Sequence, residues 1–238
     1  MPLLTPAQAK SHARIAGLLY LIIIVFGIGS EVVLRGPLVD LANARQTTEA
    51  ILGAQGVFRL SVAADMIMAV SDVALAVLLF LVLRPVGPTL ALMATVFRLV
   101  QAAILGMNLL NQHIALLLLT GAQDVNGLSP EQMQSTALLF LNAHEHGYDL
   151  GLVFFGVNSV LTGLLVWRSG FIPRLIGAGL MAAGAVYIAG SALRFLAPAV
   201  LGTFLPAYGL TIIAETAFCL WLLIAGIRTE RYPQAAAA

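Results

Sequence analysis

Residues 57–83 read VFRLSVAADMIMAVSDVALAVLLFLVL and are followed at once by Arg84 and Pro85. A helix that crosses the hydrocarbon core of a bilayer needs about 20 mainly apolar residues. The stretch is long and apolar enough to do so, and the proline after it is typical of a helix end. It therefore predicts a membrane-spanning helix, in which three charged residues, Arg59, Asp65 and Asp72, have to be accommodated.

Five more runs of the same kind surround this stretch, and glycine and proline separate them. The predicted spans are residues 15–34, 57–83, 89–119, 137–167, 174–196 and 205–227. Residues 40–55 are the longest polar stretch, and we expect them to form an amphipathic outer loop along the membrane interface. We predict one transmembrane domain over residues 1–238, an all-α bundle of six transmembrane helices.

Composition supports the same fold class. Hydrophobic residues make up 60% of the chain and charged residues 10%, with a mean hydropathy of +0.97. Soluble domains are roughly 45–50% apolar and about 25% charged. A soluble globular enzyme and a disordered chain are therefore excluded. The formal net charge of +1 argues against a nucleic-acid partner, because no basic patch is present to bind phosphates.

The basic residues near the helix ends predict the orientation. One side of the membrane would hold the N-terminus with Lys10, Arg14, Arg84, Arg168, Arg174, Arg228 and Arg231. The other side would hold Arg35, Arg45, Arg59 and Arg194. Because basic residues concentrate in the cytoplasm, we expect both termini to be cytoplasmic.

Polar residues inside the predicted spans are the main clue to function. An ionisable side chain at mid-bilayer costs at least about 2.5–3.5 kcal/mol and usually has a partner or a role. Asp65 and Asp72 are seven residues apart and so share one helix face. Further polar positions are Arg98, Gln101, Asn108, Gln112, the string His144-Glu145-His146-Gly147-Tyr148-Asp149, Arg194 and Glu215. By helix depth they predict a cavity that opens outward and narrows to Asp72, Arg98 and Glu215. Close helix packing is predicted at Gly17, Gly27, Gly29, Gly177, Gly179, Gly184 and Gly190.

Three functions fit this pattern. The favoured one is an enzyme that acts by acid–base chemistry on a lipophilic or amphiphilic substrate. Its catalytic residues would be Asp72, Glu145, His144 and Glu215, and its substrate-binding residues Arg59, Asp65, Arg98, Gln101, Asn108, Tyr148 and Arg194. The alternatives are a small-solute or proton-coupled transporter that uses the same residues, and a non-catalytic subunit or sensor whose polar residues are structural.

The ligand expected in the cavity is a membrane lipid or an amphiphilic small molecule, and a homo-oligomer stays open. We expect no metal and no cofactor. His144 and His146 are two residues apart and point about 200° away from each other on a helix. Together with His113 they lack the spacing of a zinc-protease helix, which carries two histidines four residues apart.

Four strings resemble a known family: RIAGLLYLIIIVFGI at 14–28, FRLVQAAILGMNLL at 97–110, HEHGYDLGLVFFG at 144–156 and SGFIPRLIGAGL at 169–180. They are similar to a bacterial polytopic membrane family catalogued as domain of unknown function 4386. Its recurring His-acid-X-Gly-Tyr and Phe-Arg-Leu-Val-Gln strings match His144, Glu145, Gly147 and Tyr148, and Phe97, Arg98 and Gln101. The resemblance implies a multi-pass protein of the bacterial inner membrane and implies no activity.

Overall fold

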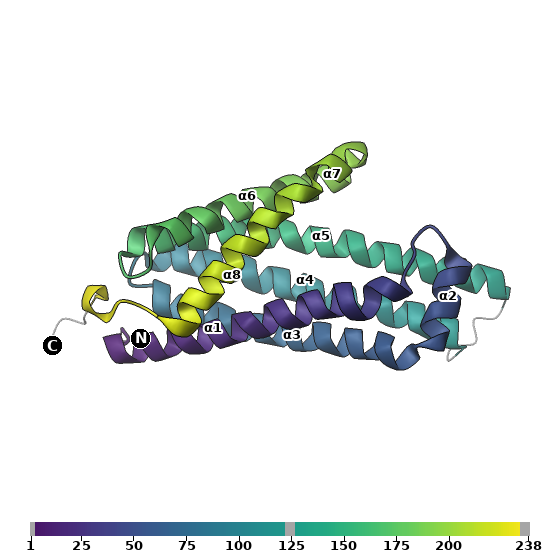
Figure 1. Cartoon of the computed structure of the whole chain (residues 1–238), viewed down its shortest axis with the longest axis horizontal. Helices are drawn as coiled ribbons and strands as arrows, with labels where there is room; N and C mark the ends of the chain where they lie inside the picture. The colour runs from purple at the N-terminus through teal and green to yellow at the C-terminus, as the bar shows by residue number, and fades with distance from the viewer. Residues whose placement is uncertain (1–2, 122–126, 234–238) are drawn as a thin grey trace. The chain divides into compact units, whose positions relative to one another are not determined.

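A computed structural model of the chain describes residues 3–121 and 127–233. The described residues form helices and connecting turns, with no strand among them (Figure 1). Six helical stretches are long and apolar enough to cross a membrane: Pro6–Leu38, Gln55–Leu83, Pro88–Thr120, Pro130–Ser169, Arg174–Leu196 and Pro198–Ile224. The prediction of an all-α protein with six membrane-spanning stretches is confirmed.

The individual elements follow the chain in a simple order. They are α1 (Pro6–Ile28), the π-helix η1 (Gly29–Arg35), the 3₁₀ turn η2 (Gly36–Leu38), α2 (Ala44–Gly53), α3 (Gln55–Leu83), α4 (Pro88–Thr120), α5 (Pro130–Ser169), α6 (Arg174–Leu196), α7 (Pro198–Phe204), the 3₁₀ turn η3 (Leu205–Ala207), α8 (Tyr208–Ile224) and the 3₁₀ turn η4 (Thr229–Arg231).

Two helices begin well before the predicted spans, and the cause is the same in both. The Thr5 hydroxyl accepts from the Gln8 amide, and the Gln8 side chain accepts from the Thr5 amide, 3.3 and 2.9 Å apart. Ser129 and Gln132 repeat this reciprocal pair at 3.3 and 2.7 Å. Each is a capping box followed by proline in the first turn. The helices therefore start in polar sequence, which a reading of hydropathy leaves out.

The bounds of the last predicted span, 205–227, also differ from those in the structure. The helical stretch there is Pro198–Ile224, in which the 3₁₀ turn η3 at Pro206 joins α7 to α8. The α8 helix ends before Gly226, whose φ of +69° is the left-handed conformation that glycine adopts most readily. The Gly226 amide donates to the Trp221 carbonyl, 3.0 Å away, and so satisfies a carbonyl of the last turn.

The described chain divides into two compact units. The first unit is made of Met1–Ile22, Ser71–Ala102 and Asp149–Ala238, and the second of Ile23–Val70 and Ala103–Tyr148. Residues of α1, α3, α4 and α5 therefore occur in both units, whereas α6, α7 and α8 belong to the first and α2 to the second.

Small residues bring the helices of the first unit close together. A Cβ at Gly177 would lie 2.6 Å from the Gly163 carbonyl, and one at Gly184 would lie 2.5 Å from the Gly156 carbonyl, so α5 and α6 touch backbone to backbone. A Cβ at Gly17 would lie 2.3 Å from the Leu223 amide nitrogen, which shows the same contact between α1 and α8. The packing role predicted for Gly29 is wrong, because no atom lies within 4 Å of a Cβ there.

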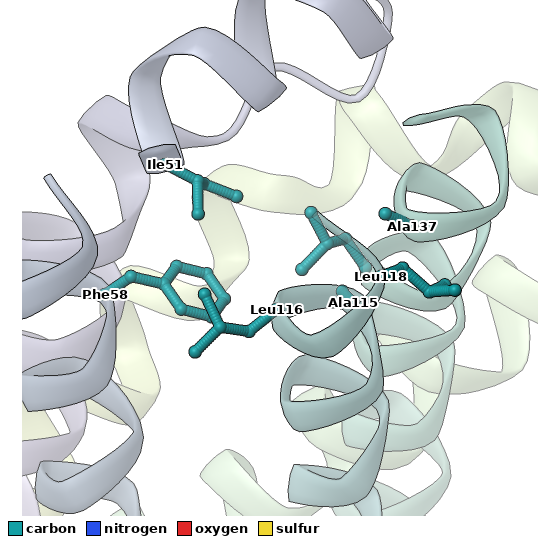
Figure 2. Packing of buried hydrophobic residues seen from close by; sticks show 7 residues of the cluster. Ile51, Phe58, Ala115, Leu116, Leu118 and Ala137 are labelled. Carbon is teal, nitrogen blue, oxygen red and sulfur yellow. The ribbon is translucent and has the colours of Figure 1, made fainter. Parts of the chain in front are cut away.

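The apolar core of the second unit is built at α2. The buried cluster contains Ile51, Phe58, Ala115, Leu116, Leu118, Ala137 and Leu141. In Figure 2, Ile51 of α2 and Phe58 of α3 lie opposite Leu116 of α4, and Ala137 of α5 lies beside Leu118. The α2 helix therefore contributes Ile51 to an apolar core that it shares with α3, α4 and α5.

Candidate functional site: two buried polar clusters

The polar residues of the first unit gather around an ion pair between α3 and α4. Asp72 Oδ1 accepts from Nε and Nη2 of Arg98, at 2.8 and 2.5 Å. The Gln101 amide, oriented to satisfy its neighbours, donates to Asp72 Oδ2 at 2.6 Å and to the Arg98 carbonyl at 3.3 Å. Asp72 is 3% exposed and Arg98 2%. Both carboxylate oxygens of Asp72 are therefore occupied by protein groups.

Aromatic rings hold the other side of the Arg98 guanidinium. Its central carbon lies 5.3 Å from the ring centroid of Tyr20 on α1 and 5.2 Å from that of Phe155 on α5. Cations at this distance from an aromatic face are stabilised by the ring quadrupole. Arg98 is thus already paired with a carboxylate and two rings.

Glu215 on α8 is held in a different way. It accepts hydrogen bonds from the Tyr20 hydroxyl at 3.1 Å and from the Tyr187 hydroxyl of α6. Among the described residues, no arginine, lysine or histidine nitrogen forms an ion pair with it. We call Tyr20, Asp72, Arg98, Gln101, Tyr187 and Glu215 the Glu215 cluster; it contains two carboxyl groups and one guanidinium.

A small cavity adjoins this cluster. It measures about 10 Å³ and is lined by Arg98, the polar residues Thr95, Asn158 and Thr162, and apolar side chains of α3, α4 and α5. The Thr162 hydroxyl donates to Asn158 Oδ1 over 3.2 Å. A space of this size holds about one water molecule.

The polar residues of the second unit gather around Arg35 in the π-helix η1. Arg35 Nη1 lies 2.8 Å from Asp65 Oδ2 of α3, and Nη2 pairs with Glu31. The Ser30 hydroxyl also contacts Asp65, at Oδ1. Asp65 is 4% exposed and Arg35 6%, whereas the Glu31 side chain is 57% exposed.

The π-helical geometry is what brings these groups together. Residues five apart stand about 140° apart around an α-helix of 3.6 residues per turn. A π-helix hydrogen-bonds residues five apart and so brings them onto the same side. Ser30 and Arg35 are five apart and both reach Asp65, an arrangement that the π-helical spacing favours.

Hydrogen bonds extend this group to His144 on α5. Gln112 Nε2 of α4 lies 2.8 Å from His144 Nε2 and 3.4 Å from Asp65 Oδ2. His144 Nδ1 lies 3.2 Å from the Asn108 carbonyl, and Asn108 Nδ2 donates to the His144 carbonyl at 2.7 Å. We call Ser30, Glu31, Arg35, Asp65, Asn108, Gln112 and His144 the His144 cluster.

The glycine of the HEHGYD string has a place in the same cluster. A Cβ at Gly147 would lie 2.1 Å from Asn108 Oδ1 and 2.6 Å from Asn108 Cγ. Only glycine therefore leaves room for the Asn108 side chain that binds the backbone at His144. This contact explains why the string has a glycine three residues after His144.

The predicted site residues fall into three groups. Asp72, Arg98, Gln101 and Glu215 lie in the Glu215 cluster, and Asp65, Asn108 and His144 lie in the His144 cluster. Asp65 and Asp72 each have their own arginine. Arg194 pairs with Asp149 of α5. Arg59 and Tyr148 are exposed and Glu145 is partly exposed. Within residues 3–121 and 127–233, no three His, Cys, Asp or Glu side chains are placed to hold a metal ion.

Six members of the two clusters were not among the predicted site residues: Tyr20, Tyr187, Ser30, Glu31, Arg35 and Gln112. Gln112 belongs to the polar stripe of α4, so its spacing is a usable signal. Tyr20 stands as a lone hydroxyl in an apolar run, a position that a packing tyrosine would also occupy. Arg35 lies at the end of its run, where an arginine usually marks the membrane surface.

The comparisons with known proteins agree with the resemblance of the four strings. The sequence model of one family, described as domain of unknown function (DUF4386), matches residues 15–226. An uncharacterized protein of Archaeoglobus fulgidus is 30% identical over 167 residues, which cover 70% of this chain and 83% of the relative. No solved structure matches the chain.

Proposed function

The chain belongs to the family described as domain of unknown function DUF4386, and we propose that it is a proton-coupled carrier of a small solute in which Glu215 binds the proton. The observation that carries the proposal is the pairing within the Glu215 cluster. The guanidinium of Arg98 is taken by Asp72, while Glu215 is held only by the hydroxyls of Tyr20 and Tyr187.

The charges of the cluster give this arrangement its chemical meaning. Asp72 and Arg98 neutralise each other, so an ionised Glu215 leaves the cluster with a net charge of −1. One proton on Glu215 brings the net charge to zero. Because an unbalanced charge is costly inside a bilayer, the two protonation states favour different surroundings. A carrier uses such a difference to couple proton binding to movement.

The hydrogen bonds of Glu215 would change with the proton. An ionised carboxylate only accepts, and both tyrosine hydroxyls donate to it. A protonated carboxyl group has to donate once, so one tyrosine must turn its hydroxyl or move away. Tyr20 lies on α1 and Tyr187 on α6, so the proton on α8 would alter contacts to two other helices of the first unit.

The cavity beside Arg98 has room for a water molecule that can pass a proton to the cluster, but not for an amphiphile. An enzyme needs room for its substrate next to the acid–base groups, and an amphiphile is far larger than the 10 Å³ beside Arg98. A proton needs no more than a water molecule. The acid–base enzyme and the structural subunit stay predictions, and the experiment below separates them from the carrier.

The test uses the purified protein in liposomes that contain a pH-sensitive dye, with the membrane potential clamped. A carrier without its solute still leaks protons through its proton-binding group, so we expect an imposed proton gradient to dissipate faster with the wild type than with Glu215→Gln. Glu49→Gln is the matched control, because Glu49 lies on α2 with its side chain 66% exposed. Equal rates for wild type and Glu215→Gln would contradict the proposal.

Infrared spectroscopy tests the proton site without any transport. The carbonyl band of a protonated carboxyl group should titrate in the wild type and be missing in Glu215→Gln. A purely structural role predicts that Glu215 keeps one protonation state over the whole pH range in which the protein stays folded. That result would reject Glu215 as the coupling group even if the liposomes leaked.

A further inference from the structure

The His144 cluster carries an inference that uses no residue of the Glu215 cluster. We propose that His144 is a proton-binding site in its own right, and that the side-chain amide of Gln112 turns over when the proton binds. The proposal rests on the hydrogen bonds of the two side chains, on an unpartnered oxygen and on the charges around them.

The hydrogen bonds fix the neutral form of the imidazole. Nδ1 faces the carbonyl of Asn108, which only accepts, so Nδ1 carries the hydrogen. Nε2 faces the amide nitrogen of Gln112 at 2.8 Å, so Nε2 accepts. The second N–H of the same amide is directed at Asp65, 3.4 Å away. His144 is therefore neutral in this arrangement, as the Nδ1–H tautomer.

Gln112 holds an oxygen that this arrangement does not use. The residue is 0% exposed, and Oε1 has no hydrogen-bond partner. A buried acceptor without a donor is destabilising, because it has lost its hydrogen bond to water. Turning the amide by half a turn would exchange its oxygen and nitrogen and place Oε1 opposite His144 Nε2.

The charges that face His144 act in both directions: Arg35 opposes an added proton, whereas Asp65 and Glu31 favour one. The π-helix η1 contributes Arg35 and Glu31, and α3 contributes Asp65. From α4 the imidazole meets the neutral groups of Asn108 and Gln112. The cluster thus has two carboxylates and one guanidinium, and a proton on His144 balances its net charge.

The proton step is balanced within these groups. A proton from hydronium adds to the Nε2 lone pair and leaves a water molecule, and no bond of the ring is broken. The new Nε2–H needs an acceptor, which the turned Gln112 supplies through Oε1. The turn removes the 3.4 Å contact between Gln112 and Asp65, whose Oδ2 keeps its 2.8 Å bond from Arg35. Protonation of His144 on α5 therefore removes a contact of Asp65 on α3.

Nitrogen NMR of protein labelled at histidine tests the proposal directly. The chain has four histidines, and the His144 signals are those missing in His144→Gln. We expect the Nδ1–H tautomer at high pH and two protonated nitrogens after acidification of the folded protein. The Nε2–H tautomer at high pH, or a His144 that stays neutral down to the lowest pH at which the protein stays folded, would overturn the proposal.

Substitution of Gln112 supplies a second readout. Gln112→Leu removes the acceptor and should lower the proton affinity of His144 about tenfold, whereas Gln112→Glu supplies a charged acceptor and should raise it about tenfold. The control Asn142→Leu makes the same amide-to-leucine change two residues from His144 and should leave the affinity unchanged. Equal affinities in all three variants would refute the role of Gln112.

The Glu215→Gln variant separates this inference from the proposed function. We expect its His144 titration to match that of the wild type, because His144 lies in the other unit and shares no hydrogen bond with Glu215. A His144 titration that disappears with Glu215→Gln would mean one shared site, and the separate site proposed here would be rejected.

Discussion

The contact between α1 and α8 predicts a large effect from the smallest possible substitution. In Gly17→Ala the new Cβ would lie 2.3 Å from the Leu223 amide nitrogen and 2.6 Å from Leu223 Cα. Ordinary van der Waals contact begins near 3.4 Å. The two backbones must therefore separate by about 1 Å, because neither clashing atom belongs to a flexible side chain.

The expected cost follows from overpacking. Forcing an extra methyl group into a packed interface costs about 1–3 kcal/mol. A protein of this size loses roughly 2–4 °C of melting temperature for each kcal/mol. We therefore expect Gly17→Ala to melt about 2–12 °C below the wild type. Tyr20 lies one turn from Gly17 on α1, so its bond to Glu215 should weaken as well.

The chain supplies its own reporter for this experiment. Cys219 is the single cysteine, is 1% exposed, and its thiol lies 3.5 Å from the Gly17 carbonyl. A maleimide that fluoresces on reaction with thiols will label it only when α1 and α8 separate. Heating the detergent-solubilised protein with this reagent gives the melting curve.

Gly106→Ala is the matched control for the helix-interior substitution. Gly106 is an exposed α4 residue, and no atom lies within 4 Å of a Cβ built there. Its variant should melt at or slightly above the wild-type temperature, since alanine favours helix over glycine. If Gly17→Ala labels and melts like Gly106→Ala, the close approach of α1 and α8 is refuted.

Two other predictions concern buried polar groups. Arg98→Met or Asp72→Leu alone should lower the free energy of unfolding by about 3–5 kcal/mol, because a buried charge loses its partner. The double variant should recover most of this loss in the same melting assay. Additive losses in the double variant would show that the two residues do not form a pair. Burial raises the pKa of the Tyr232 phenol, which packs on Phe171 with ring centroids 5.1 Å apart. The stability from its packing is present below pH 10, the ordinary phenol value, and is lost as pH rises through the higher folded-state value. The difference in phenolate absorbance between the wild type and Tyr232→Phe should therefore appear only above pH 10. A difference that appears with the ordinary phenol pKa of 10 would contradict this prediction.

The spans could be predicted because a membrane imposes a simple rule on composition and length. Residues 174–196 agree with α6 at both ends, and 57–83 differs from α3 only at its start. The early starts of α1 and α5 depend on hydrogen bonds of Thr5 and Ser129, which act before the apolar residues begin. Capping boxes can be recognised in the sequence, so the starts of α1 and α5 could have been predicted.

The site could be predicted only in part, for a reason of geometry. Charges inside apolar runs stand out, and so Asp65, Asp72, Arg98 and Glu215 were found. Their partners depend on how helices are rotated against each other. Tyr20 meets Glu215 from a helix 195 residues away in sequence, and no local pattern encodes that contact.

The π-helix η1 has a consequence for the alignment of relatives. Its hydrogen bonds join residues five apart, whereas those of an α-helix join residues four apart. The segment therefore holds about one residue more than an α-helical turn would. Deleting one residue between Ser30 and Arg35 would leave them four apart, on one face of an ordinary α-helix, and keep both beside Asp65. A gap of one residue there would therefore mark a relative that retains the cluster, whereas a substitution of Arg35 without a gap would mark one that has lost it.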